Sequence, residues 1–146
     1  MDGCSKPVST RWPRRARQQQ HAGADCAKFA LTQLAFWLLA VTHGRAKNFS
    51  IQHRRGAQFH LAPLYDVLSA WPINGCGPNQ LPYQRANLAM ALQGQNLHRG
   101  LNEIDVKHGQ RLAVSCGPGV FDRMTAMVER VDDAPGMGAS RAGKLS

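Results

Sequence analysis

Two short segments of this chain carry the side chains with the clearest chemical potential. Residues 42–50 read T-H-G-R-A-K-N-F-S, and residues 63–67 read P-L-Y-D-V. Asn48 in the first segment and Asp66 in the second offer an amide oxygen and a carboxylate. Both are hard oxygen ligands, which suit Mg²⁺ rather than zinc. The two segments therefore predict a site where oxygen ligands hold a divalent cation.

Three further side chains of the first segment extend this candidate site. His43 precedes Asn48 by five positions, and its imidazole can accept a proton near neutral pH. Arg45 can contact phosphate as a fork-shaped donor, and Lys47 can meet phosphate or substrate as a point charge. Phosphoryl transfer requires a positioned nucleophile and neutralised phosphate charge, so a proton acceptor, cationic side chains and metal ligands are the residue types that bear on it.

Each of these residues also has a plain structural interpretation. An Asn at the start of a strand is usually a turn residue, and an Asp such as Asp66 often caps the element that follows it. Arg45 and Lys47 equally suit a solvated surface. Taken singly, the structural interpretations of Asn48 and Asp66 are favoured. The joint order of helix, loop, hairpin and Asp favours the functional one.

Hydrophobic patterning predicts the elements that hold the two segments. Apolar residues crowd residues 25–41 and predict a helix that is buried on most sides. Alternation predicts a β-hairpin near residues 48–62, with strands over 48–53 and 58–62. Pro63 ends this hairpin because proline cannot donate to a strand ladder.

The second half of the chain is predicted to be a loop followed by helices. Residues 71–82 are rich in Pro, Gly and Asn and predict a loop, while residues 87–92 are an apolar piece of undecided type. Helical periods appear over residues 103–115 and, more clearly, over 120–131. We expect the helix that ends near Val41 to pack against the helix at 120–131.

The composition of the chain limits its domain organisation, its partners and its location. The polar, Arg-containing residues 1–24 and the Gly/Ser/Ala-rich residues 133–146 are predicted to be tails around a domain over residues 25–132. The net charge of +9 favours contact with phosphates, acidic surfaces or nucleic acid. No apolar run reaches the roughly 20 residues of a membrane span. The 4 cysteines are scattered, without a metal-ligand pair, so a cytoplasmic location is expected.

The two segments resemble the catalytic core of the HipA-type serine/threonine kinase toxins, in which they read T-D-G-H-A-K-N-F-S and P-L-Y-D-V. The resemblance covers about residues 25–92 and becomes a general helical layout beyond them. It implies an α+β, mainly helical fold, similar to the large C-terminal lobe of a protein kinase with one β-hairpin. It also implies ATP and Mg²⁺ as cofactors, with the metal held by Asn48 and Asp66.

The chain departs from the family's pattern at the proton acceptor. His43 stands where the family has its base Asp, and Arg45 replaces the family's His, while Lys47 matches. Imidazole is bulkier than a carboxylate and lacks the negative charge that orients the substrate hydroxyl, so we expect a large loss of rate. The sequence shows neither a strand-borne Lys nor a Gly-rich loop before residue 42, which predicts a truncated C-terminal portion with weak or absent ATP binding.

These features predict a catalytically impaired fragment of a HipA-like serine/threonine protein kinase. Intact relatives are toxins of bacterial type II toxin–antitoxin modules, so the resemblance implies a DNA-binding antitoxin as partner and a protein of the translation machinery as substrate. The alternative belongs to another class. In it, the chain is a non-catalytic binding module that docks an antitoxin-like partner, or DNA, through its basic surface.

Overall fold

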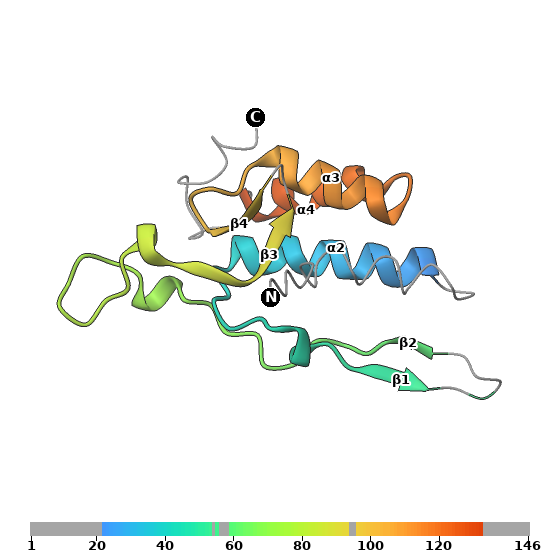
Figure 1. Ribbon diagram of the computed structural model, residues 1–146, viewed down its shortest axis with the longest axis horizontal. Coiled ribbons are helices and arrows are strands. Elements are labelled where there is room, and N and C mark those ends of the chain that lie inside the picture. The colour runs from blue at the N-terminus through green and yellow to red at the C-terminus, as the bar shows by residue number, and fades with distance from the viewer. Residues whose placement is uncertain (1–21, 54, 56–58, 94–95, 133–146) are drawn as a thin grey trace, which may run out of the picture.

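The computed structural model of the protein describes residues 22–53, 55, 59–93 and 96–132. This part of the chain forms three α-helices and two small antiparallel sheets (Figure 1). In chain order the elements are α2 (Ala22–Leu38), β1 (Ile51–His53), β2 (Phe59–Leu61), β3 (Asn87–Gln93), β4 (Leu97–Gly100), α3 (Val106–Cys116) and α4 (Val120–Asp132). The α+β class predicted from the sequence is therefore confirmed.

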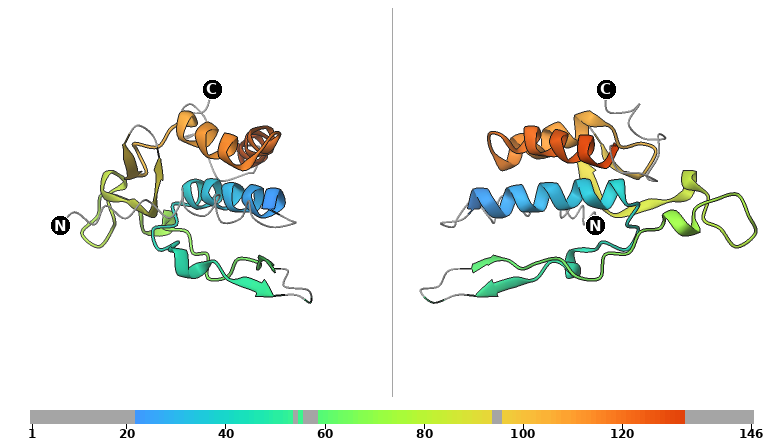
Figure 2. Two further views of the ribbon diagram at one scale, coloured as in Figure 1. Left: turned by 45° about the vertical axis from the view of Figure 1, so that its right-hand side comes forward. Right: turned by 180° about the vertical axis from the view of Figure 1, so that it is seen from behind.

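Helix α2 is the centre of the arrangement. Figures 1 and 2 show α3 and α4 on one side of it and the β1–β2 hairpin on the other. Helix α2 contacts α3, α4 and β2, and α3 and α4 contact each other. The predicted packing of the first helix on the helix at 120–131 is confirmed. Because α2 has neighbours on two sides, residues all around it are buried, among them Phe29, Leu34 and Trp37.

The end of α2 differs from the prediction for a physical reason. The helix ends at Leu38 rather than near Val41, because Ala40 adopts a left-handed backbone conformation with φ of 52°. The N–H of Val41 then donates to the carbonyl of Phe36 at 2.7 Å, and the N–H of Ala40 donates to that of Trp37 at 3.2 Å. This pair of hydrogen bonds is a Schellman motif, which usually places glycine at the left-handed position.

The β1–β2 hairpin forms where it was predicted, but it is shorter. Strand β1 begins only at Ile51, because residues before it form a turn, and Ile51 pairs with Leu61 in the antiparallel register. Both backbone groups of Leu61 face α2. Its N–H donates to the carboxylate of Asp25 at 3.1 Å, and its carbonyl accepts from Lys28 Nζ at 2.8 Å. One turn of α2 therefore satisfies the two backbone groups of Leu61 at the edge of β2.

A second hairpin corrects the prediction of a single one. Strands β3 and β4 pair antiparallel around residues 94–95, with an irregular register between Asn87 and Leu92. Alternate residues Leu88, Met90 and Leu92 are buried, and β3 contacts α3. The apolar piece of undecided type is thus a strand. Strand β4 gave little signal because only Gly100 within it is buried.

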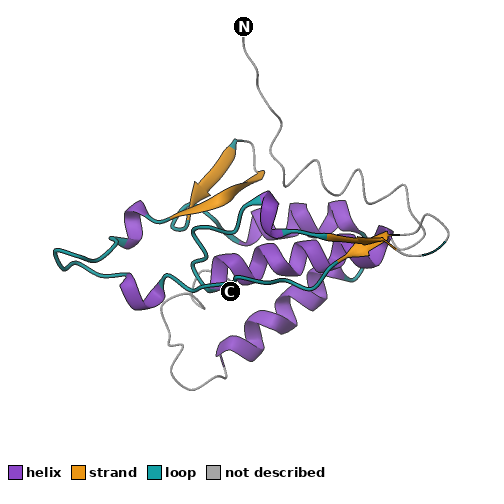
Figure 3. Cartoon of the chain, turned by 90° about the horizontal axis from the view of Figure 1, so that it is seen from below, coloured by secondary structure: helices purple, strands orange, loops and turns teal. Residues whose placement is uncertain are grey.

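The connection between β2 and β3 is mostly irregular, as predicted for residues 71–82 (Figure 3). It contains two short 3₁₀ turns, η2 (Trp71–Ile73) and η3 (Tyr83–Arg85). Its first part is tied to the end of α2. Trp71 Nε1 donates to the carbonyl of Leu38 at 2.7 Å, and Ser69 Oγ donates to that of Leu39 at 2.8 Å. These bonds satisfy helix carbonyls that have no partner within the helix.

Helices α3 and α4 complete the described part. Helix α3 begins at Val106, later than predicted, because Asp105 caps it by accepting from the N–H of Lys107 at 2.9 Å. The tails predicted over 1–24 and 133–146 lie outside the described residues, apart from 22–24, which belong to the first turn of α2. Among the helices described, none has the length and apolar character needed to cross a membrane.

Candidate functional site between the end of α2 and the hairpin

Close packing on α2 fixes the loop that carries most of the predicted site residues. Gly44 lies against the ring of Phe36, so a Cβ added at Gly44 would come within 2.4 Å of that ring. Phe49, at the other end of the loop, packs its ring against Phe29 and Phe36, with centroid separations of 5.2 and 5.9 Å. The loop is therefore held on the aromatic face of α2 at two points, and only glycine fits at the first.

Between these two points the chain forms a 3₁₀ turn, η1 (Ala46–Asn48). Asn48 is buried, with 6% of its surface exposed, and its Oδ1 accepts from the N–H of Arg45 at 3.1 Å. This bond fixes the orientation of the Asn48 amide and leaves a second lone pair on Oδ1. The side chains of Arg45 and Lys47 are exposed. The loop thus exposes two cationic side chains that are close in sequence to a buried amide of fixed orientation.

The segment at 63–67 meets the segment at 42–50 through hydrogen bonds of Tyr65 and Asp66, including one from Ser50 Oγ to the Tyr65 hydroxyl at 3.5 Å. Tyr65 donates its hydroxyl hydrogen to the carbonyl of Lys47 at 3.1 Å. His43 Nε2 lies 3.3 Å from the backbone oxygen of Asp66. The Tyr65–Lys47 and His43–Asp66 pairs are 18 and 23 positions apart in the chain. The fold therefore brings the two segments singled out in the sequence into contact.

Asp66 has an unusual backbone conformation at this point of contact. Its φ is 55°, in the left-handed region that few residues other than glycine adopt and that Asp and Asn tolerate best. Asp66 is exposed, and within the described part of the chain its carboxylate makes no hydrogen bond or ion pair. Such local strain is common at binding and catalytic positions. The carboxylate is therefore accessible to solvent.

The oxygen ligands at this site, from Asn48 and Asp66, are too few to complete the shell of a Mg²⁺ ion on their own. No group of three or more His, Cys, Asp or Glu side chains able to hold a metal occurs in the part of the chain that is described. Asn48 and Asp66 supply at most two protein ligands. Mg²⁺ is usually bound by one or two protein ligands together with water and substrate phosphates. Asn48 and Asp66 alone would therefore need water or phosphate oxygens to complete the shell of a Mg²⁺ ion.

Sequence reasoning missed the residues that hold the site together. Gly44 and Tyr65 were part of the quoted motifs, yet they received no role. The close approach of Gly44 to Phe36 and the bond from Tyr65 to Lys47 give each of them a positioning role. A glycine directly after His43 in a predicted loop was the available signal for the first. The hydroxyl of Tyr65 gave no comparable signal.

A comparison with known protein families gives a match. A family model described as the HipA-like C-terminal domain matches residues 10–136, which is most of the 146-residue chain. The match includes both segments of the candidate site and all the helices and strands of the structure. This chain belongs to the family of HipA-like C-terminal domains.

Proposed function

We propose that the chain forms the metal-binding and substrate-facing side of a HipA-like serine/threonine protein kinase, with phosphoryl transfer impaired by the residue at position 43. The observation that carries this proposal is the contact between His43 and Asp66, which joins the two kinase-like segments. The family match supports it because it spans both segments. A toxin role in a toxin–antitoxin module follows from the same resemblance.

The residues divide the work of phosphoryl transfer among them. Bound Mg²⁺ would neutralise phosphate charge. Asn48 Oδ1 and the Asp66 carboxylate would hold it, the first fixed by the Arg45 N–H and the second exposed. Arg45 and Lys47, both exposed, would contact phosphate oxygens of ATP.

His43 limits the chemistry. Neutral imidazole can accept the proton of a substrate hydroxyl, but it brings no negative charge to orient that hydroxyl beside a cation. Its Nε2 is also engaged with the Asp66 carbonyl at 3.3 Å. A nitrogen that donates to this carbonyl cannot at the same time accept a proton. The site therefore combines plausible metal ligands with a poor base.

Paramagnetic broadening tests the metal site directly. Mn²⁺ replaces Mg²⁺ in a sample of ¹⁵N-labelled chain with ATP, and we expect the amide signals near Asn48 and Asp66 to broaden. Asp66→Asn should remove this effect, because it deletes the exposed carboxylate. Asp122→Asn is the matched control, since Asp122 is exposed on α4. Equal broadening in wild type and Asp66→Asn would exclude the proposed ligand set.

Restoring the missing base tests the kinase assignment. A nucleotide-binding small lobe is supplied in trans, and transfer of radiolabelled phosphate to a generic protein substrate is measured. His43→Asp should raise the rate by about 10²–10⁴-fold, the usual range for a positioned acid or base. The same substitution in the chain alone should give no labelling, because ATP would lack its clamp. Strong labelling by the unmodified chain alone would overturn this account of His43.

A non-catalytic role is the second candidate, and the basic surface favours it. The net charge is +9, and the site loop exposes Arg45 and Lys47. In this role the chain would dock an antitoxin-like protein or DNA. Binding to a duplex of random sequence should then weaken steeply with salt, and Arg45→Ala with Lys47→Ala should flatten that dependence. Salt-independent binding would exclude contact through these charges.

A further inference from the structure

A cavity lies on the opposite side of α2 from the candidate site. It has a volume of about 340 Å³, is partly open to solvent, and is lined by residues of α2, β3, α3 and α4 and by Ile104 and Asp105 before α3. Most of its wall is apolar, from side chains such as Leu34, Trp37 and Leu112. None of its lining residues belongs to segments 42–50 or 63–67. The cavity is therefore separate from the proposed phosphoryl-transfer site.

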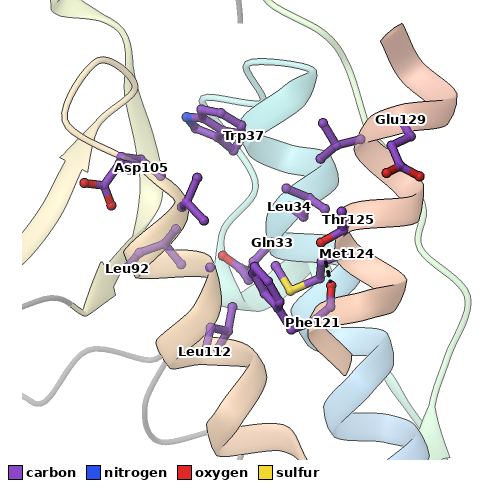
Figure 4. Close-up of a pocket in the computed structure, with 14 residues that line it drawn as sticks. Gln33, Leu34, Trp37, Leu92, Asp105, Leu112, Phe121, Met124, Thr125 and Glu129 are labelled. Carbon is purple, nitrogen blue, oxygen red and sulfur yellow. Dashed lines mark hydrogen bonds between the residues drawn. The ribbon is translucent and has the colours of Figure 1, made fainter. Parts of the chain in front are cut away.

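One polar side chain of the cavity has no structural explanation. Gln33 on α2 lines the cavity and is 1% exposed, and its Nε2 is buried without a hydrogen-bond partner. Leaving a buried amide unpaired is costly, whereas an apolar side chain of the same shape would avoid that cost. Figure 4 shows Gln33 projecting between the helices, with Phe121 and Met124 beside it. The unpaired amide of Gln33 suggests a hydrogen-bond partner that the described part of the chain does not supply.

The geometry points to a small-molecule site. We propose that the cavity binds a compact, mostly apolar molecule with one polar edge that carries a hydrogen-bond donor beside an acceptor, as in a carboxamide or lactam. Gln33 would pair with that edge, because its amide offers both functions and can present either after a half-turn. The volume lies within the usual range for small-ligand sites.

The walls of the cavity support this class of ligand. Met124 is unbranched and flexible, so its thioether can move aside to give a ligand access to the buried Gln33 amide. Thr125 and Glu129 are exposed and line the cavity from α4, which places polar groups at its mouth. An apolar interior with a few polar groups is typical of sites that orient a small ligand.

A matched pair of probes tests the proposal. The ¹⁵N-labelled full chain is titrated with 2-naphthamide and with 2-methylnaphthalene, which has the same ring system without the amide. We expect 2-naphthamide to shift the side-chain NH₂ signals of Gln33 and to bind about tenfold more tightly, as one or two hydrogen bonds predict. Equal affinity for both probes would overturn the role of Gln33. Failure of both to bind at millimolar concentration would overturn the site.

Three variants locate the binding. Gln33→Met should keep affinity for 2-methylnaphthalene and lose the tenfold preference; a preference that persists would contradict the proposal. Gly109→Leu should block both probes, because a side chain at Gly109 grows toward Met124 inside the cavity. Val114→Leu, on the same helix but 80% exposed and outside the cavity, should bind like wild type. If sedimentation instead shows a dimer that the probes dissociate, a second copy fills the cavity and the small-molecule assignment is wrong.

Discussion

The bonds from α2 to the β1–β2 hairpin give a quantitative prediction. The Asp25 carboxylate accepts the N–H of Leu61, and Lys28 donates to the carbonyl of the same residue. Leu61 is 4% exposed, so water cannot readily replace either partner. Asp25→Ala should therefore leave a buried N–H unpaired. This is the single substitution that best separates the hairpin from α2.

The expected cost combines two effects. A hydrogen bond to a charged group contributes about 1.5–3 kcal/mol, and the partial exposure of Asp25 places this one at the low end. Asp25 also lies in the first turn of α2, where a negative charge contributes about 0.3–1 kcal/mol. Together these predict that Asp25→Ala lowers the free energy of unfolding by about 2 kcal/mol.

Asp122→Ala is the control that isolates the hairpin bond. Asp122 also lies in the first turn of a helix, α4, and is exposed. Its removal should cost only the helix-terminus effect of about 0.3–1 kcal/mol. Urea unfolding measures both variants, and hydrogen exchange reports the Leu61 amide. If Asp25→Ala costs no more than Asp122→Ala and the Leu61 amide stays protected, the bond does not hold the hairpin.

Three further predictions follow from local geometry. Gly109→Ala should raise the free energy of unfolding, measured by thermal melting, by about 0.5–1 kcal/mol. Alanine favours the helix, and its Cβ would meet Met124 Cε at an ordinary contact distance of 3.5 Å. Gly44→Ala should instead cost about 1–3 kcal/mol in the same melting assay, since its Cβ would clash with Phe36. The carboxylate of Asp105 should make the free energy of unfolding depend on pH in acid. Burial tends to raise the pKa of Asp105, but the charge of His108 and backbone hydrogen bonds outweigh burial and lower this pKa below 3.8. The contribution of Asp105 to the free energy of unfolding is fully present above pH 3.8 and is lost as pH falls through the lowered pKa. Asp105→Asn should therefore weaken the loss of stability in acid, as measured by urea unfolding at a series of pH values.

Periodicity was sufficient to predict the elements that carry the site. The crowding of apolar residues before position 42 predicted α2, and alternation predicted the β1–β2 hairpin, because both depend on which residues face the core. The order of these elements also indicated that the segments at 42–50 and 63–67 meet, although the contact that the structure shows is between His43 and Asp66. Local patterns were adequate here because the site is formed by segments that are close in sequence.

Features that depend on tertiary contacts could not be predicted. The end of α2 relies on Ala40 in a conformation that alanine seldom adopts, so no glycine marked it. Strand β4 escaped notice because its side chains are mostly exposed and its partner is irregular. The bonds from Asp25 and Lys28 to Leu61 cross 36 and 33 positions, and nothing local distinguishes these residues from surface charges.

The anchoring of the site explains why a base substitution alone can test its chemistry. Ala40, three residues before His43, accepts from the N–H of Ala70, and Ser69, three residues after Asp66, donates to Leu39. These bonds fix both approaches to the His43–Asp66 contact independently of the imidazole. A change at position 43 should therefore alter the proton acceptor while the Asp66 backbone stays in place. Activity differences between His43 and its Asp variant can then be assigned to charge and proton affinity rather than to a collapsed site.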